Sequence, residues 1–131
     1  IILYLCRMDT ESLLKEIIDA CYCVHKTLHQ GFYESVYHRA LLHELELRGL
    51  QAESERHIPV YYKGLPVGTF KADIVVENKV IIELKVVGEL GLEHELQLVN
   101  YLSATGIDNG LLVNFGSRQI QVRRKFRLQK N

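Results

Sequence analysis

Three charged residues interrupt two otherwise apolar stretches near the middle of the chain: Asp73, Glu83 and Lys85. The chain is predicted to turn at Asn78. Residues that pair across such a turn have numbers that add up to about twice 78, so Asp73 and Glu83 should lie opposite each other, within one residue. Alternation along a strand puts Glu83 and Lys85 on one face. The pattern therefore predicts two carboxylates and one amine that converge.

Two neighbouring carboxylates repel and raise each other's pKa unless a cation lies between them. Oxygen ligands of this kind suit Mg²⁺ or Mn²⁺ better than zinc. A nearby lysine can orient or deprotonate a water, or stabilise charge on a phosphate, while the metal polarises a phosphoryl oxygen. This combination favours phosphodiester hydrolysis. Spacing alone leaves open a plain ion pair of Lys85 with Glu83 or Asp73 at a strand end.

Another carboxylate, Glu34, is predicted on a helix. It shares one helical stripe with Tyr37, Leu41 and Leu45, which indicates that it points toward the interior. An inward carboxylate needs a partner, and it could be a further metal ligand, directly or through water. The alternative is that Glu34 only stabilises the start of its helix.

Polar residues on a later helix could line the same site. Gln97 and Tyr101 are one helical turn apart, and His94 precedes them on the same stripe. Taken alone, such residues more often lie on the surface, so the spacing does not decide between the two locations.

The elements that must position these residues follow from periodicity and turn signals. The predicted order is ααβββαββ, with an antiparallel meander formed by the first three strands and turns at 63–64 and 78–79. The apolar runs 74–76 and 80–82 predict a sheet covered on both faces, hence an α/β sandwich. The predicted helices span about 9–30, 33–48 and 92–105, and the strands span about 57–62, 67–77, 80–87, 110–115 and 119–126.

The composition predicts one globular domain over residues 1–131, because 47% of the residues are hydrophobic and 24% are charged. Sixteen basic and sixteen acidic residues cancel, so any nucleic-acid binding must be local. The C-terminal segment is locally basic, and it could follow a phosphate backbone or form a solvated last strand. Its basic residues are Arg118, Arg123, Arg124, Lys125, Arg127 and Lys130.

The apolar start of the chain, residues 1–6, is too short to span a membrane, so we expect no membrane segment. Residues 1–7 can be read as an extension upstream of a natural start at Met8. The three cysteines, Cys6, Cys21 and Cys23, cannot all pair with one another, and we expect them to be buried small hydrophobes. These features favour the cytoplasm.

Several of these residues also form an ordered set of motifs. Residues 31–37 (GFYESVY) match the motif that names the GxxExxY family. Asp73, the Glu-Leu-Lys of 83–85 and the QLVNY of 97–101 resemble the PD-(D/E)xK core and the QxxxY element of RecB-type nucleases. The NFG of 114–116 is similar to that family's strand ending. The resemblance extends from Met8 to Phe126, and its one departure is Ala72, where the superfamily name has proline.

The resemblance implies a restriction-endonuclease-like fold, in which helices flank a mixed central sheet. It implies that Asp73 and Glu83 bind Mg²⁺ or Mn²⁺, that Lys85 serves the attacking water and that Glu34 completes the acidic cluster. Gln97 and Tyr101 would support the site or touch substrate phosphate, and Tyr37 would also support the site.

The function expected from these features is metal-dependent hydrolysis of nucleic acid, with DNA favoured over RNA. The alternative is a catalytically silent module of the same fold that binds nucleic acid or a protein partner. A homodimer is suggested because so small a chain has little surface with which to hold a duplex and cleave both strands.

Overall fold

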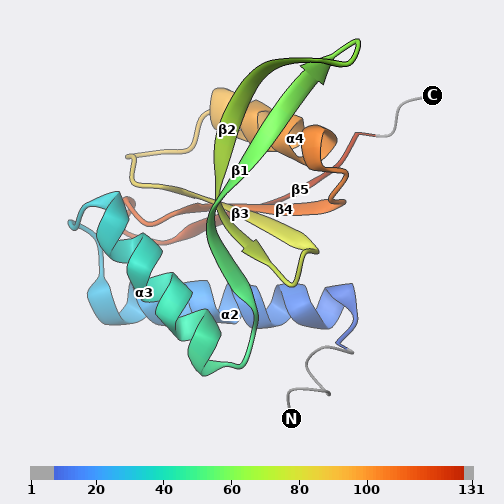
Figure 1. Ribbon diagram of the computed structural model, residues 1–131. Coiled ribbons are helices and arrows are strands. Elements are labelled where there is room, and N and C mark those ends of the chain that lie inside the picture. Colours follow the sequence, from blue (N-terminus) through green and yellow to red (C-terminus); the bar gives the residue numbers. More distant parts are fainter. Residues whose placement is uncertain (1–7, 129–131) are drawn as a thin grey trace.

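The computed structural model describes residues 8–128, which form one mixed sheet between two layers of helices (Figure 1). The order of the elements is the predicted ααβββαββ. The elements are α2 (Thr10–Leu28), α3 (Glu34–Leu47), β1 (Ala52–Tyr62), β2 (Leu65–Val76), β3 (Val80–Lys85), α4 (Leu92–Thr105), β4 (Asn109–Asn114) and β5 (Gln121–Phe126).

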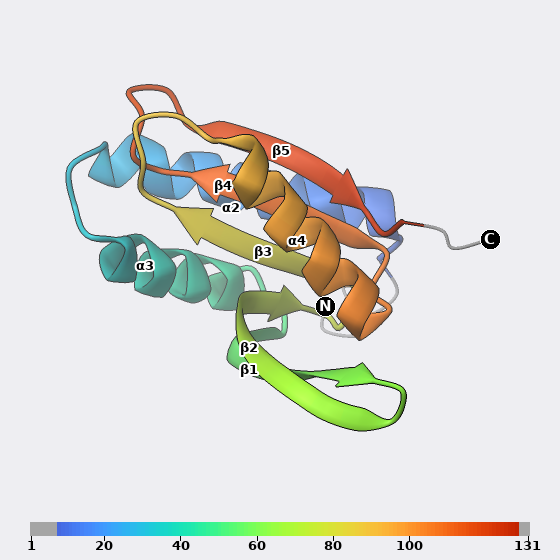
Figure 2. The ribbon, with the colours of Figure 1, turned by 90° about the horizontal axis from the view of Figure 1, so that it is seen from above.

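The strands lie in the sheet in chain order, β1-β2-β3-β4-β5. Neighbouring strands are antiparallel except β3 and β4, which are parallel with Val80 beside Asn109 and Lys85 beside Asn114. Parallel neighbours need a crossover connection, and α4 supplies it. Consequently α4 covers one face of the sheet while α2 and α3 cover the other (Figures 1 and 2).

The two helical layers follow from apolar stripes. On α2 the side chains of Leu13, Ile17 and Cys21 are buried at helical spacing, and the Asp9 carboxylate caps the helix by accepting a hydrogen bond from the Ser12 amide at 2.7 Å. The α3 stripe is equally buried and packs with α2 against Ile74, Ile82 and Leu84 of the sheet. Leu98 and Leu102 of α4 pack on the opposite face with Val75, Ile81 and Leu112.

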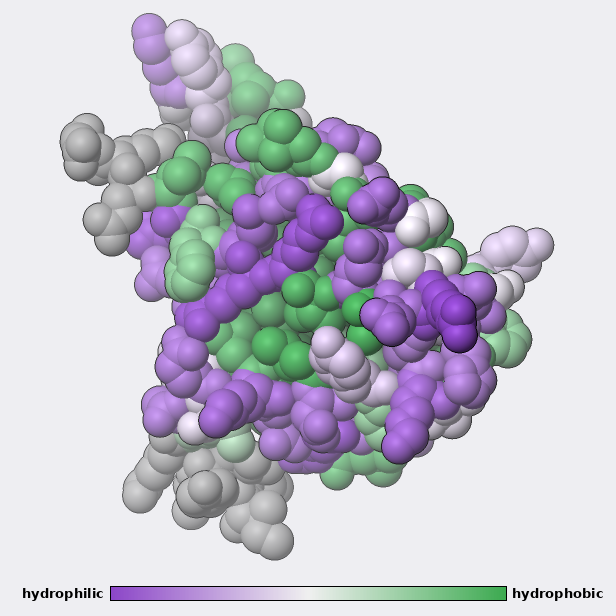
Figure 3. All heavy atoms as spheres, turned by 180° about the vertical axis from the view of Figure 1, so that it is seen from behind, coloured by the Kyte–Doolittle hydropathy of each residue, from purple (hydrophilic) through white to green (hydrophobic). Residues whose placement is uncertain are grey.

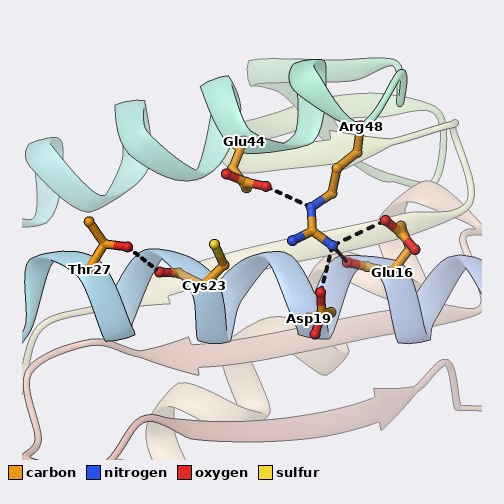
Figure 4. Close-up of polar contacts among 6 residues, drawn as sticks. All are labelled: Glu16, Asp19, Cys23, Thr27, Glu44 and Arg48. Atoms are coloured by element: carbon orange, nitrogen blue, oxygen red, sulfur yellow. Dashed lines mark hydrogen bonds and ion pairs between the residues drawn. The ribbon is translucent and has the colours of Figure 1, made fainter.

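An arginine joins α2 to α3 (Figure 4). The Arg48 guanidinium, just after α3, donates to Glu44 of its own helix at 2.8 Å. It also reaches Glu16 and Asp19 of α2 at 3.1 and 2.8 Å. A planar guanidinium can serve several carboxylates at once, so one side chain fixes the relative position of both helices.

The hairpin of β1 and β2 leaves the central sheet and rises beside α4 as a two-stranded arm, residues 57–71 (Figures 1 and 2). The bend lies between the pairs Ser54↔Ile74 and Arg56↔Ala72. At this point the register places Glu55 opposite Asp73, and Glu55 has a φ of 54°. A left-handed residue twists a strand locally, so the arm turns away from the sheet at Asp73.

Some sequence expectations were wrong in detail. β1 begins at Ala52, ahead of the predicted start at 57, and β5 begins at Gln121, later than predicted. Of the two described cysteines Cys21 is buried, but Cys23 is exposed. Two residues apart on a helix, they face nearly opposite directions, so only one of them can join the core. Cys6 and the expected extension 1–7 lie outside the described residues.

The face of the molecule opposite the viewer in Figure 1 has a hollow lined by apolar side chains and rimmed by polar ones (Figure 3). Around this hollow, polar side chains are interspersed with smaller apolar patches (Figure 3). No helix within residues 8–128 has the length and apolar character that a membrane span requires.

Candidate active site

The turn between β2 and β3 sets which residues meet. Glu77 and Asn78 adopt left-handed conformations, and the Lys79 amide donates to the Val76 carbonyl at 2.9 Å. The paired residues are then Val76↔Val80, Val75↔Ile81 and Ile74↔Ile82. Continuing this register places Asp73 opposite Glu83, as the sequence predicted.

At this point the two carboxylates accept hydrogen bonds from backbone amides of the neighbouring strands. Glu83 Oε1 accepts a hydrogen bond from the Asp73 amide at 3.1 Å, and Asp73 Oδ2 accepts one from the Leu84 amide at 2.8 Å. The regular pairing of β2 with β3 ends at Ile74↔Ile82, where β2 bends into the arm. The bend therefore leaves amides that the side chains satisfy, and those bonds fix both carboxylates in place.

The site is electrostatically unbalanced. Glu83 is buried, with 4% of its surface exposed. Burial, and then the charge of Asp73, raises the pKa of Glu83 to about 9. A buried acid beside a second carboxylate is costly to ionise, and a cation bound beside the pair would lower that cost.

Lys85 extends from the same strand face as Glu83. Its Nζ lies 3.3 Å from Gln97 Oε1 of α4, so α4 contributes to the position of the ammonium group. None of the ion pairs among residues 8–128 includes Lys85. The amine is thus held by a neutral amide, whereas a structural ion pair would have neutralised it.

Glu34 lies at the rim of this site. The expected inward stripe is buried at Tyr37, Leu41 and Leu45, but Glu34 itself is exposed at the first turn of α3. Partial desolvation, and then the charge of Asp73, raises the pKa of the Glu34 carboxyl. The N-cap residue Tyr33 makes no side-chain capping hydrogen bond, and Glu34 is the acidic residue of the first turn of α3.

Tyr37 acts on the loop that precedes Glu34. Its hydroxyl donates to the His29 carbonyl and accepts from the Phe32 amide at 3.2 Å. The ring stacks on Phe115, with centroids 4.9 Å apart. Tyr37 is fully buried, and it holds the entry to α3 against the sheet.

Tyr101 reaches the site from α4. Its ring stacks on Phe70 of β2, with centroids 3.6 Å apart and planes inclined by 11°. Burial, then the charges of Glu83 and Asp73, raises the pKa of its hydroxyl. His94, on the same stripe, instead accepts the Gly91 amide at 3.1 Å and so belongs to the start of α4.

Asn114 is a residue whose role the sequence reasoning missed, although it appeared in the strand-ending motif. It is fully buried at the end of β4, beside Lys85. Its amide group bonds both the N–H and the carbonyl of Val87, each at 3.0 Å, and its Nδ2 donates to Gln121 at 2.9 Å. The sequence did contain a sign of this role: Asn114 is a polar residue at the end of an apolar strand, and that strand neighbours the one that carries Lys85.

The basic C-terminal strand is mostly neutralised. Glu95 of α4 pairs with Arg123 at 2.9 Å and with Lys125 at 2.6 Å. Glu11 of α2 pairs with Arg124, and Asp108 pairs with Arg127. These contacts favour a strand tied to both helical layers over one that follows phosphates. Lys130 lies outside the described residues.

The donor set fits a hard divalent cation. The hydrogen bonds above use one oxygen of Asp73 and one of Glu83, which leaves the other oxygen of each for a ligand role. Within residues 8–128 no three His, Cys, Asp or Glu side chains are grouped closely enough to hold a metal ion. Mg²⁺ commonly needs only one or two carboxylates, with waters and substrate phosphate completing its shell.

Comparison with known proteins identifies the family of the chain. The model of the PD-(D/E)XK nuclease superfamily matches residues 11–125, and the chain belongs to that superfamily. Its mixed five-stranded sheet flanked by helices is a restriction-endonuclease-like fold, as expected.

A solved structure titled "Crystal structure of SSO0001" is similar, with a TM-score of 0.56 and 23% sequence identity. The match covers 74% of this chain and 52% of that one, so the chain spans about half the length of its solved relative. The search of curated proteins gave no match.

Proposed function

We propose that this chain is a nuclease that depends on Mg²⁺ or Mn²⁺ and hydrolyses phosphodiester bonds of nucleic acid, with DNA favoured over RNA. The observation that carries the proposal is the Asp73–Glu83 pair, in which burial and repulsion raise the pKa of Glu83 to about 9. Burying two neighbouring carboxylates is energetically unfavourable, and a divalent cation bound between them would offset their repulsion. The superfamily supports nuclease chemistry in general terms.

Asp73 and Glu83 would hold the metal, and Glu34 would contribute from the rim, most simply through water. When bound, the metal supplies a Lewis acid for the phosphoryl oxygen and a more acidic water. Lys85 would orient the attacking water and stabilise negative charge on the phosphate, while Gln97 holds its Nζ. Tyr101 would support the acidic pair from α4.

Further proposals rest on the sequence motifs. We infer membership of the GxxExxY group from residues 31–37, one domain over residues 1–131 and action in the cytoplasm. A homodimer would provide the surface that one small chain lacks for a duplex.

The test is cleavage of end-labelled single- and double-stranded DNA and RNA by the purified chain with Mn²⁺, Mg²⁺ or EDTA. Lys85→Ala should lower metal-dependent cleavage on the order of 100-fold or more. Lys15→Ala, at an exposed position of α2, is the matched control and should cut like the wild type.

Two results would count against the proposal. Cleavage in EDTA as fast as cleavage with Mn²⁺ or Mg²⁺ would exclude a metal-dependent reaction. Undiminished cleavage by Lys85→Ala would exclude a role of Lys85 in the reaction. Measurable Mn²⁺ binding without cleavage of any substrate would favour the alternative function, a silent module that binds nucleic acid or a protein partner.

A further inference from the structure

A groove lies between the arm and α4, and Tyr101 is one of its lining residues. It has a volume of about 590 Å³, within the range of small-molecule sites. The β1–β2 arm contributes one wall and α4 the other. The lining residues are Pro59, Val60, Tyr61, Phe70, Asn100, Tyr101, Ser103 and Ala104.

The lining indicates what this groove could hold. None of its eight residues carries a charge, so the groove offers no cationic side chain to a phosphate. Its aromatic and aliphatic groups, among them the Phe70–Tyr101 stack, suit a flat ring, and Asn100 and Ser103 can hydrogen-bond to polar ring edges. A nucleobase has this combination of an apolar face and a polar edge.

The groove and the acidic site share Tyr101. Tyr101 lines the groove and stacks on Phe70, while burial, and then the charges of Glu83 and Asp73, raises the pKa of its hydroxyl. One stripe of α4 connects the two sites, from Gln97 at Lys85 through Tyr101 to Ala104 in the groove. Seven residues of helix span about 10 Å, so a base in the groove could belong to a nucleotide whose phosphate is at the acidic site.

We propose that this groove binds an unpaired nucleobase next to the phosphodiester that is cleaved. The proposal rests on the nuclease function above and narrows its substrate class. A base within a duplex is stacked and paired, so it cannot enter a groove between a hairpin and a helix without leaving the stack. The preferred substrate is therefore single-stranded nucleic acid, or a duplex end or flap with unpaired bases.

The experiment uses single-stranded oligonucleotides that carry one 2-aminopurine, whose fluorescence is quenched when it stacks. The protein is the full chain with Lys85→Ala, in Mn²⁺, so that binding is observed without turnover. We expect quenching that is strong at one position and lost when Tyr61→Ala is added. Tyr62→Ala is the matched control, because Tyr61 and Tyr62 are 61% and 62% exposed but only Tyr61 lines the groove.

A second measurement uses the wild-type active site. An abasic nucleotide at the quenched position should raise KM roughly tenfold in the wild type, and the penalty should shrink in Tyr61→Ala. Ala104→Phe should fill the groove and likewise raise KM for single-stranded substrates roughly tenfold. Ala104 is exposed, so this variant does not test folding of the core.

The outcomes separate this inference from the nuclease function. Metal-dependent cleavage with no abasic penalty and equal quenching in both tyrosine variants would overturn the groove proposal alone. Tyr61-dependent quenching without cleavage of any substrate would support the groove and overturn the nuclease. Preference for fully paired duplex by tenfold or more would also contradict the groove.

Discussion

Asp73 and Glu83 each accept a hydrogen bond from the other's strand, Glu83 from the Asp73 amide and Asp73 from the Leu84 amide. Neither side chain can rotate away without leaving a half-buried amide unpaired, which costs roughly 1–3 kcal/mol. The acidic pair is therefore held together by the backbone despite its repulsion. In the proposed function such a site would be organised before a metal bound, which would reduce the cost of binding it.

The first prediction concerns the metal and Asp73. In Asp73→Asn the repulsion disappears, so the metal-free protein should melt at the same or a higher temperature than the wild type. The same variant should lose the stabilisation by Mn²⁺, about 2.7 kcal/mol at a hundredfold excess over Kd in the wild type. Thermal melts with and without Mn²⁺ measure both effects.

Glu46→Gln is the control for this charge change, because Glu46 is an exposed acid at the far end of α3. It should leave the Mn²⁺ shift intact. An equal Mn²⁺ shift in Asp73→Asn and the wild type would show that the cation binds elsewhere.

The second prediction concerns pH. The pKa of Glu83 is raised from 4.5 to about 9, so between these values the folded state keeps a proton that the unfolded state releases. The free energy of unfolding of the metal-free protein should therefore fall as pH rises from 5 to 9. In Glu83→Gln, and in the wild type saturated with Mn²⁺, this fall should be smaller.

Chemical denaturation at a series of pH values in EDTA provides the measurement. A wild type that gains stability between pH 5 and 9 relative to Glu83→Gln would reverse the sign and refute the raised pKa.

The third prediction separates the two parts of Tyr101. Tyr101→Phe keeps the stack on Phe70 and removes the hydroxyl near the acidic pair. Cleavage should fall roughly 10- to 100-fold with little change in melting temperature. Tyr101→Ala should also lose stability, by about 0.5–1.5 kcal/mol or more, because the ring stack disappears. Equal activity of Tyr101→Phe and wild type would restrict Tyr101 to packing.

The fourth prediction concerns Asn114, which bonds both backbone groups of Val87. Asn114→Ala should lower the free energy of unfolding by roughly 1–3 kcal/mol and loosen the segment between β3 and α4. Hydrogen exchange of the Val87 amide should accelerate, and cleavage should fall because that segment joins Lys85 at the end of β3 to α4, which carries Gln97.

Asn109→Ala is the matched control at the other end of β4, where the side chain binds Arg124. It should cost stability without affecting cleavage below its melting temperature. Equal losses of activity in both variants would indicate a general effect on β4.

The sequence was sufficient for the centre of the site because the relevant geometry is local. A turn at Asn78 and the alternation of strands determine that Asp73, Glu83 and Lys85 converge. The order of elements was equally predictable from periodicity. The exposure of Glu34 could not be predicted. A helical stripe indicates which side of the helix faces the sheet, but it does not indicate where along the helix the sheet ends.

Contacts between distant segments also lay beyond the sequence. The Phe70–Tyr101 stack depends on the bend at Asp73, which brings the arm beside α4. The ion pairs of Glu95 with Arg123 and Lys125 depend on where α4 crosses β5. Periodicity contains no information about such crossings.

The turn before β2, at Lys63–Gly64, and the turn after it, at Asn78, would respond differently to an inserted residue. Asp73 and Glu83 are separated from Asn78 by equal numbers of residues, and one inserted residue there would turn one of them to the opposite face of the sheet. An insertion at Lys63–Gly64 would lengthen only the free end of the arm, at a small entropic cost. Natural variation and engineered labels should therefore be confined to the tip of the arm, where they leave the acidic pair in register.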